Sequence, residues 1–351
     1  MPPPTRFVRP ALLLGGIAAI AAGIALAVLP GASATTVPPM LATPPPVAQP
    51  AQPDQHLATA RYVIPGASIQ AAVDEVAAVG GGTVLLGAGT HVIAAPIRLR
   101  SQVALVGRSS ASTDHTTIQN AAGPDMVIML DGRAGGLDNV VLANLTVDCA
   151  LTEAQRSYPA DPGTNYGIYI TDTAAVNSRI LLDGVQVTSC TVGFHSSGTT
   201  DLTVRDSNVH DNGGWTRYSH NADLRRVSRV LLENSTFTAA TAGTGLDVAH
   251  GHNVTVRGVT ASGNAFRGIR FTGSSHVDVI SCTTADNVGG GIVFDSAAGG
   301  VQMFRIHTST STGNRVGIAV SAGSSIGQVW NNTVLDNGTN LALDASATSV
   351  R

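Results

Sequence analysis

The sequence predicts an all-β fold, a single-stranded parallel β-helix in which coils of about 23 residues stack along one axis. Four segments begin with glycine and continue as an alternating strand, and asparagines recur in the turns between such strands. The composition agrees, because charged residues make up 12% of the chain and aromatic residues 4%, whereas glycine occurs 39 times. Abundant glycine, valine, threonine and asparagine are typical of short strands joined by turns.

The repeat is clearest in four strands, at spacings of 23, 23 and 26 residues, that begin at Gly245, Gly268, Gly291 and Gly317. The turn asparagines, separated by 52, 23, 27 and 23 residues, are Asn212, Asn264, Asn287, Asn314 and Asn337. The interval of 52 predicts a coil whose own asparagine is missing. Asparagine suits these corners because it tolerates the left-handed backbone conformation and its amide can hydrogen-bond its neighbours in a ladder.

One amphipathic helix is predicted before the coils, over residues 68–76. Ser68 is its candidate N-cap, and the apolar residues 69, 72, 73 and 76 share one face. Three consecutive glycines, residues 80–82, follow it. We expect this segment to be an N-terminal capping helix.

The chain divides into three predicted parts. Residues 1–34 are predicted to be a signal peptide or signal anchor, because two arginines precede the apolar run 11–29 and the small residues 32–34 follow it. Residues 35–60 are rich in proline and alanine and are predicted to be a disordered linker outside the fold. The β-helix domain takes residues 61–351. We therefore expect a secreted or extracytoplasmic protein, which contacts a membrane only through the first segment if that segment is not cleaved.

Three cysteines, Cys149, Cys190 and Cys282, are an odd number for an exported protein, so at least one thiol is unpaired or pairs between chains. Their spacing fits no zinc motif, and we expect small buried side chains stacked inside the fold. The formal net charge is -3, and every fixed cation is an arginine. The sequence contains no basic patch of the kind that would indicate a nucleic-acid partner.

The region from Ser68 to Gly107, a helix followed by Gly-Gly-Gly-Thr-Val-Leu-Leu-Gly-Ala-Gly-Thr, resembles the N-terminal part of the pectate-lyase-like superfamily of right-handed parallel β-helix proteins. The resemblance covers about residues 62 to 345. It implies a right-handed β-helix and a carbohydrate-related function, but it does not select one reaction, since lyases, hydrolases, C5-epimerases and phage tailspikes share this scaffold.

Two members of that superfamily can be compared residue by residue. The segment 193–213 is similar to a stretch of alginate C5-epimerases, but Val192, His195 and Ser197 stand where that family carries its catalytic Tyr, Asp and His. Residues 221–223 resemble the Asn-Thr-Asp of polygalacturonases, yet the paired aspartates of that family are here the single Asp247. The scaffold therefore matches both families, and neither catalytic set does.

An outward-facing stripe follows from the alternation of strand residues, because positions two apart share a face. If Leu246 and Val248 point into the core, Asp247 points out. The residue at the equivalent position of each neighbouring coil should point out as well. The predicted stripe, on five successive coils and about 19 Å long, consists of Tyr169, His195, Asp223, Asp247 and Arg270. This length fits a few sugar units of an extended polysaccharide, the partner that we expect.

The stripe supports three alternative functions. Hydrolysis is the leading one, because Asp223 and Asp247 on adjacent coils approach the spacing of paired glycosidase carboxylates, and their repulsion is expected to raise one pKa. A lyase or C5-epimerase acting on a uronic acid polymer is the second, with Tyr169, His195 and Arg270 as base and charge neutraliser. The third is a non-catalytic glycan-binding or surface-structural β-helix. We expect that the protein requires no cofactor. The sequence does not decide whether calcium binds, because oxygen ligands have no distinctive spacing here.

Further residues beside the stripe are candidates for substrate binding. The coil between His195 and Asp223 is longer than the next one, 28 residues against 24, and it contains aromatic side chains that can stack on sugar rings. The predicted substrate-binding residues are Trp215, Arg217, Tyr218, His220, His250, His252 and Arg267.

Overall fold

The computed structural model describes residues 46–53, 59–110, 114–121, 125–132, 135–157, 164–171, 176–344 and 348–350. The predicted signal or anchor, 1–34, lies outside these residues. Among the residues that are described, no helix is long and apolar enough to cross a membrane.

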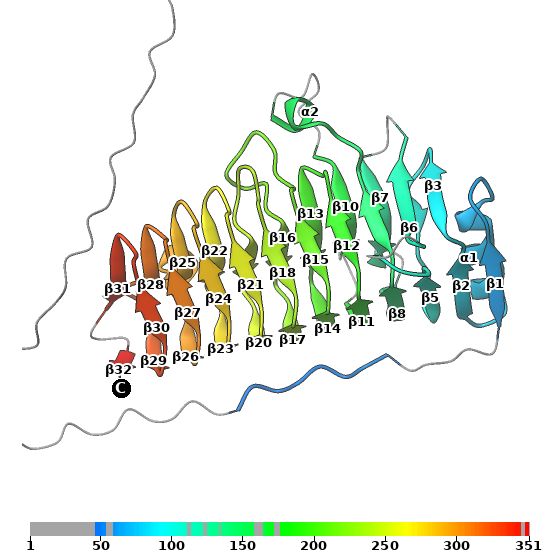
Figure 1. Cartoon of the computed structure of the whole chain (residues 1–351). Coiled ribbons are helices and arrows are strands. Elements are labelled where there is room, and N and C mark those ends of the chain that lie inside the picture. Colours follow the sequence, from blue (N-terminus) through cyan, green and yellow to red (C-terminus); the bar gives the residue numbers. More distant parts are fainter. Residues whose placement is uncertain are drawn as a thin grey trace, which may run out of the picture. The chain divides into compact units, whose positions relative to one another are not determined.

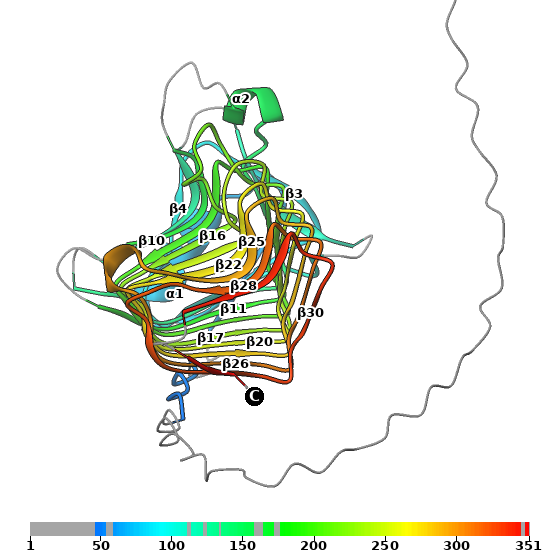
Figure 2. The same ribbon diagram turned by 90° about the vertical axis from the view of Figure 1, so that its left-hand side faces the viewer.

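The chain winds through three parallel sheets, and each coil contributes one strand to each sheet over most of the stack (Figure 1). Seen along the axis, the sheets form the three sides of the cross-section (Figure 2). Every strand pairing is parallel, for example β10 with β13 and β14 with β17. The predicted all-β parallel β-helix is confirmed.

Sheet A has twelve strands, in the order β1 (Ala60–Val63), β2 (Gly82–Leu86), β5 (Val103–Val106), β8 (Asp138–Ala143), β11 (Asn177–Asp183), β14 (Thr199–Arg205), β17 (Ser228–Glu233), β20 (His252–Arg257), β23 (Ser275–Ile280), β26 (Gln302–His307), β29 (Ser325–Trp330) and β32 (Thr348–Val350). Sheet B has ten, β3 (Gly89–Ile93), β6 (Thr116–Asn120), β9 (Thr146–Asp148), β12 (Gln186–Thr188), β15 (Asn208–His210), β18 (Thr236–Thr238), β21 (Thr260–Ser262), β24 (Thr283–Ala285), β27 (Thr310–Thr312) and β30 (Thr333–Leu335). Sheet C also has ten, β4 (Ile97–Arg98), β7 (Met126–Asp131), β10 (Tyr166–Thr171), β13 (Val192–Ser197), β16 (Ala222–Arg225), β19 (Leu246–Ala249), β22 (Arg267–Thr272), β25 (Gly290–Asp295), β28 (Val316–Val320) and β31 (Thr339–Leu343).

The core is one continuous column of inward-facing side chains. Alternation in each strand sends every second residue inward, so that equivalent apolar residues of successive coils stack on one another. Phe271 and Phe294 on successive coils of sheet C show this, since their rings meet edge to face at a centroid distance of 5.2 Å. Phe304 from sheet A meets Phe294 in the same way at 4.6 Å. The outward positions between the apolar residues carry the polar side chains, which places any site on a sheet face.

An asparagine ladder runs along the corner between sheets B and C. Side-chain Nδ2 groups donate to the next Oδ1 from Asn264 to Asn287 (2.8 Å), from Asn287 to Asn314 (2.8 Å) and from Asn314 to Asn337 (3.0 Å). The predicted ladder is therefore confirmed. These amides are buried or half-buried and satisfied by each other, which fixes the corner of each coil against the next.

Helix α1 (Ile69–Ala78) begins at Ser68, whose Oγ accepts a hydrogen bond from the backbone N–H of Ala71. Its buried face, which includes Ile69, Val73 and Val76, joins the core beside β1 and β2 (Figure 1). The predicted helix is thus present, with the predicted N-cap and apolar face.

Residues 46–53 lie on the outer face of sheet A, although the sequence predicts that 35–60 stays outside the fold (Figure 1). We call this segment the strap. Nε2 of Gln49 donates to Thr255 Oγ1 (3.2 Å), the N–H of Ala51 to Asp201 Oδ1 (2.9 Å), and Nε2 of Gln52 to Thr203 Oγ1 (2.9 Å). The expectation is wrong for this segment because polar outward residues of sheet A satisfy its backbone and amide groups.

Cys149 and Cys190 form a disulfide with a Cα–Cα distance of 5.0 Å between neighbouring coils. One disulfide and one free thiol agree with the odd cysteine count, and all three cysteine side chains are buried, as expected. Cys282 is free and buried, as expected, and burial raises the pKa of its thiol to about 11. Such a thiol is unreactive near neutral pH.

Candidate functional site

The predicted stripe is present on the outer face of sheet C. The strand register places Tyr169 beside His195, His195 beside Asp223, Asp223 beside Asp247, and Asp247 beside Arg270. The row continues with Val293 and Ala319, so the titratable part ends at Arg270. The alignment of these side chains follows the sequence prediction, whereas their roles remain hypotheses.

A second outward row, two residues further along each strand, supplies partners that the sequence analysis missed. Arg225 follows Asp223 by two residues and is aligned with Ala249, so its long side chain can reach across that small residue. Asp295 occupies the same row on β25. Both residues could have been found by extending the period-two rule by one more position in each strand.

The two rows together form an alternating chain of charges, which we call the charge chain. Arg225 joins two carboxylates, with Nε 2.5 Å from Asp223 Oδ1 and Nη2 2.9 Å from Asp247 Oδ2. Arg270 joins the next pair, with Nη1 3.0 Å from Asp247 Oδ1 and Nε 3.2 Å from Asp295 Oδ2. The charge chain ends at Arg267, which lies 3.1 Å from Asp295. Within this chain three arginines balance three carboxylates.

Asp247 is fully buried, with 0% of its side chain exposed. It points outward as predicted, but the two arginine side chains and His220 cover it. Nε2 of His220 lies 3.7 Å from Asp247 Oδ2. A carboxylate that is covered and paired in this way cannot reach a glycosidic bond, and it acts instead as the counter-ion that holds Arg225 and Arg270.

His220 is predicted to bind substrate but is only 2% exposed. Its Nδ1 accepts a hydrogen bond from the N–H of Thr244 (2.9 Å), so the ring proton of the neutral histidine lies on Nε2, facing Asp247. Burial lowers the pKa of His220, which keeps the ring neutral. His220 therefore has a structural role beneath Asp247.

His195 pairs with Asp223 at one end of the charge chain. Nδ1 of His195 lies 3.0 Å from Asp223 Oδ2, and 15% and 14% of the two side chains are exposed. Burial works to raise the pKa of Asp223, but the hydrogen bond with His195 and the charge of Arg225 outweigh it, so this pKa lies below its ordinary value. The sequence predicts that repulsion between Asp223 and Asp247 raises one of their two pKa values. Asp223 is not that group, because His195 and Arg225 stabilise its ionised form.

Two tyrosines flank His195. The ring of Tyr169 stacks on His195 at 5.2 Å with an interplanar angle of 15°, and Tyr166 lies 4.6 Å from the Tyr169 ring. Burial raises the pKa of Tyr166, so its hydroxyl stays protonated at neutral pH. These rings form an aromatic surface next to the acid–base pair, which suits stacking against a sugar ring.

A pocket of about 340 Å³ lies over the other end of the charge chain. Arg217 and Tyr218 from the long loop line it, together with Phe266, Arg267, Arg270 and Asp295. Three arginines face a single carboxylate on this lining, so the pocket suits an anionic group. Trp215 is 56% exposed and does not line the pocket.

His250 and His252 do not line this pocket, although the sequence predicts them to be substrate-binding residues beside the stripe. The chain has already turned into sheet A at this point, because His252 is the first residue of β20. Nδ1 of His252 lies 2.8 Å from Ser275 Oγ, and its ring packs against His276. Both histidines therefore belong to the neighbouring corner.

His220, Asp223 and Asp247 bring their ligand atoms within 4.8 Å of one another, a spacing that could hold a metal ion. The donor set does not fit one. Nε2 of His220 carries the ring proton because Nδ1 accepts from Thr244, and Asp247 is already neutralised by two arginines. These three residues are better explained as part of the charge chain, and the calcium left open by the sequence finds no fitting ligand set among them.

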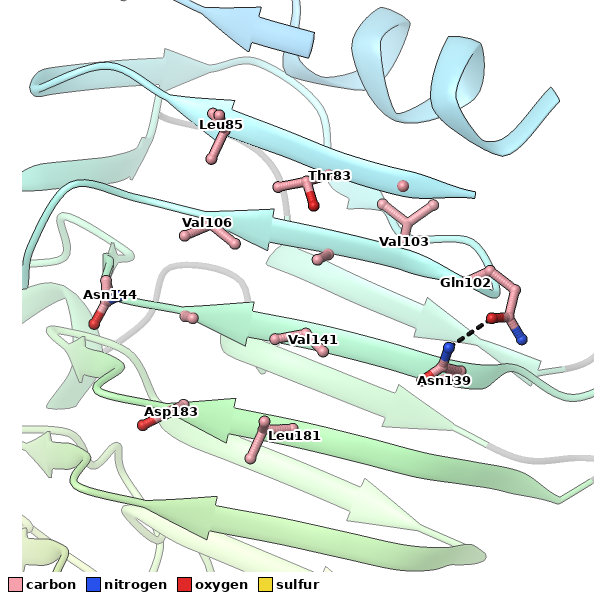
Figure 3. Close-up of a pocket in the computed structure, with 13 residues that line it drawn as sticks. Thr83, Leu85, Gln102, Val103, Val106, Asn139, Val141, Asn144, Leu181 and Asp183 are labelled. Carbon is pink, nitrogen blue, oxygen red and sulfur yellow. Dashed lines mark hydrogen bonds between the residues drawn. The ribbon is translucent and has the colours of Figure 1, made fainter. Parts of the chain in front are cut away.

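A second hollow, of about 350 Å³, lies on the outer face of sheet A (Figure 3). Its floor is mainly apolar, with Leu85, Val106, Val141 and Leu181 on four neighbouring strands. Asp183 is its one titratable lining residue. The hollow therefore lacks the grouped acids, bases and arginines of the sheet C face.

Comparison with known families agrees with the fold. Residues 166–339 match the family described as "right handed beta helix region". The fold is a right-handed parallel β-helix, as the sequence predicts. No curated protein matches the chain.

Several solved structures share the fold at low sequence identity. The tailspike protein of E. coli bacteriophage HK620, solved in complex with a hexasaccharide, aligns with a TM-score of 0.59 and 15% identity over 82% of this chain and 57% of the tailspike chain. A DFA-IIIase from Arthrobacter chlorophenolicus A6 aligns with a TM-score of 0.53 and 9% identity over 77% of this chain and 88% of that chain. The A-module of a mannuronan C-5 epimerase from Azotobacter vinelandii aligns at 0.47 and 19% identity over 82% and 97%.

Proposed function

We propose that the protein binds an acidic polysaccharide across sheet C and removes the C5 proton of a uronate residue, as a lyase or a C5-epimerase. The pairing of His195 with Asp223 carries this proposal. An ionised Asp223 only accepts hydrogen bonds, so Nδ1 of His195 donates to it, and in the neutral imidazole Nε2 then carries the lone pair that a base needs. The hexasaccharide bound by the HK620 tailspike supports a glycan partner for this fold.

The arginines supply the second requirement of this reaction. Removal of the C5 proton places negative charge on the uronate carboxylate, which a neighbouring cation stabilises. Arg225 lies on the coil next to His195, and Asp223 and Asp247 orient its guanidinium through Nε and Nη2. Arg270 lies three coils from His195, so it is placed to hold the carboxylate of a neighbouring sugar unit, with Nε and Nη1 bonded to Asp295 and Asp247.

The proton and the electron pair can then follow two routes. The proton moves from C5 to Nε2 of His195 in both. In a lyase the electron pair forms the C4–C5 double bond and the leaving oxygen takes a proton, for which the stacked Tyr169 is the proposed donor. In an epimerase the pair stays in the enolate and a proton returns to the opposite face of C5.

Hydrolysis by Asp223 and Asp247 is the second candidate, favoured by the close approach of the two carboxylates. It needs one protonated carboxyl to donate to the glycosidic oxygen. The lowered pKa of Asp223 and the burial of Asp247 make this donor hard to supply. A non-catalytic glycan-binding role uses the same aromatic and arginine surface without the proton transfer. We further propose that the protein acts outside the cytoplasm, with residues 1–34 as its export signal or anchor.

The test is incubation of the purified protein with neutral and acidic polysaccharides, while ultraviolet absorbance of unsaturated uronate, reducing ends and C5 configuration by NMR are followed together. His195→Asn should abolish the activity. His210→Asn is the matched control, because His210 also pairs with a carboxylate, Asp211 at 2.6 Å, but on sheet B. New reducing ends without absorbance would establish hydrolysis instead, and binding without any product would establish the non-catalytic role.

A further inference from the structure

The outer face of sheet B carries an ordered set of hydroxyl groups that the proposed reaction does not use. One outward row consists of threonine on five successive coils, Thr236, Thr260, Thr283, Thr310 and Thr333. The second outward row, two residues further along the first four strands, consists of Thr238, Ser262, Ala285 and Thr312. We call these two rows the threonine array.

The array is regular in two directions. Adjacent coils are about 4.8 Å apart, and the two rows are separated by two strand residues, about 6.7 Å. The residues between the rows, such as Phe237 and Ala261, are fully buried, so each strand is anchored from inside. Asparagines of the ladder follow β21, β24 and β27 by two residues, at Asn264, Asn287 and Asn314. They therefore hold the strands at a fixed spacing.

The array hydroxyls are available to a ligand. Thr236 donates to Asn208, but the side chains of Thr260, Thr283, Thr310 and Thr333 make no hydrogen bond to any described part of the protein. Each presents a hydroxyl and a methyl group, and β-branching limits the rotation of both. Outward threonines on sheet A differ, because Thr203 and Thr255 already bond to the strap.

The array also carries no charge. The strands β18, β21, β24, β27 and β30 contain no acidic or basic residue. Sheet C holds the charge chain, and sheet A holds ion pairs such as Arg257 with Glu233. Charged groups keep a strongly held hydration shell of their own, whereas spaced hydroxyl and methyl groups can fit into an ordered array of water molecules.

We propose that the threonine array is a binding face for ice, with the ordered oxygen lattice of the crystal surface as its ligand. A rigid, uncharged lattice of hydroxyl and methyl groups loses little conformational entropy on binding a second ordered lattice. This function is separate from the polysaccharide site, which lies on another side of the coil (Figure 2).

The test uses the full protein and measures the coarsening of ice grains in frozen sucrose solution and the enrichment of protein in slowly growing ice. The wild type should arrest coarsening and enter the ice. Thr260→Tyr and Thr310→Tyr, which place a bulky ring in the array, should each lose both effects. Gln328→Tyr makes the same kind of change on the outer face of sheet A and should keep them.

Circular dichroism and melting temperature must be unchanged in all three variants, and activity on polysaccharide should persist in them, so that failure here is distinguishable from failure of the proposed reaction. Coarsening equal to that in an albumin solution overturns the proposal, as does retention of the effects in both array variants. Capture by crystalline cellulose without any effect on ice would also overturn it and assign the array to a glycan surface.

Discussion

Asn221 donates from its side-chain Nδ2 to Oδ1 of Asn264 over 3.3 Å, and its own Oδ1 accepts from Nδ2 of Asn212 over 3.0 Å. It thereby fills the one gap in the asparagine ladder. In the coil that lacks its own asparagine, Ala240 takes that corner, and its N–H donates to Asn264. Because Asn221 stands two residues before Asp223, the same contacts fix the start of the strand that carries the acid–base pair.

Asn221→Ala is expected to lower the free energy of unfolding by about 1 to 3 kcal/mol, because it removes Asn221 Oδ1, the acceptor of the buried backbone N–H of Asn212. Denaturant unfolding followed by circular dichroism measures the change. Asn208→Ala is the matched control, since Asn208 is exposed on sheet B. Equal stability of the two variants would contradict the role assigned to Asn221.

Asp247→Asn is expected to cost about 3 kcal/mol of stability, since it leaves Arg225 and Arg270 without their shared buried counter-ion. The reorientation of Arg270 should also weaken polysaccharide binding. Thermal unfolding and binding titration measure the two effects. Asp206→Asn, at an exposed corner, should change neither, and an unaffected Asp247→Asn protein would show that the charge chain is not held through this residue.

Removal of the strap is expected to destabilise the domain. Gln49 and Gln52 bond to Thr255 and Thr203, and Leu231, aligned between those threonines, is only 8% exposed. A chain beginning at residue 59, which keeps all of β1, should therefore unfold about 1 to 3 kcal/mol more easily than one beginning at residue 41, an amount typical of exposing one aliphatic side chain. Identical denaturation curves would mean that the strap contributes nothing to the free energy of unfolding.

Acid should weaken the strap through Asp201. The hydrogen bond from Arg229 holds the pKa of Asp201 below its ordinary value, and the N–H of Ala51 adds to this effect. A group whose pKa is lowered by folding stabilises the fold above its unfolded pKa, and that stability is lost as the pH falls through the folded pKa. Asp201→Asn should thus show a smaller loss of stability between pH 5 and the acid limit, measured by melting temperature against pH; parallel curves for variant and wild type would refute this linkage.

The stripe could be predicted from sequence because it depends on local geometry alone. Alternation and a constant coil length fix which residue of each strand faces outward, and Asp223, Asp247 and Arg270 follow from that rule. Burial could not be predicted in the same way. Asp247 is outward but covered, because side chains from neighbouring coils fold across it, and their rotamers are not set by the periodicity.

The turns between the strands and the strap were less predictable than the strands. Proline and glutamine in residues 46–53 indicate a linker by composition, yet the segment binds because sheet A happens to offer Asp201, Thr203 and Thr255 along one line. His252 lies close to Asp247 in sequence, but the chain turns a corner between them. Composition and sequence distance carry no information about such turns.

The uniform register of the coils has a consequence for how this protein can change in length. Duplication of a whole coil between Asp247 and Arg270 would move them about 4.8 Å further apart and uncouple the two halves of the charge chain. Duplication of a coil beyond Ala319 would lengthen the molecule and leave every contact of the charge chain in place. Growth of this solenoid is therefore tolerated at its C-terminal end and restricted across its middle, so the position of an inserted coil matters more than its sequence.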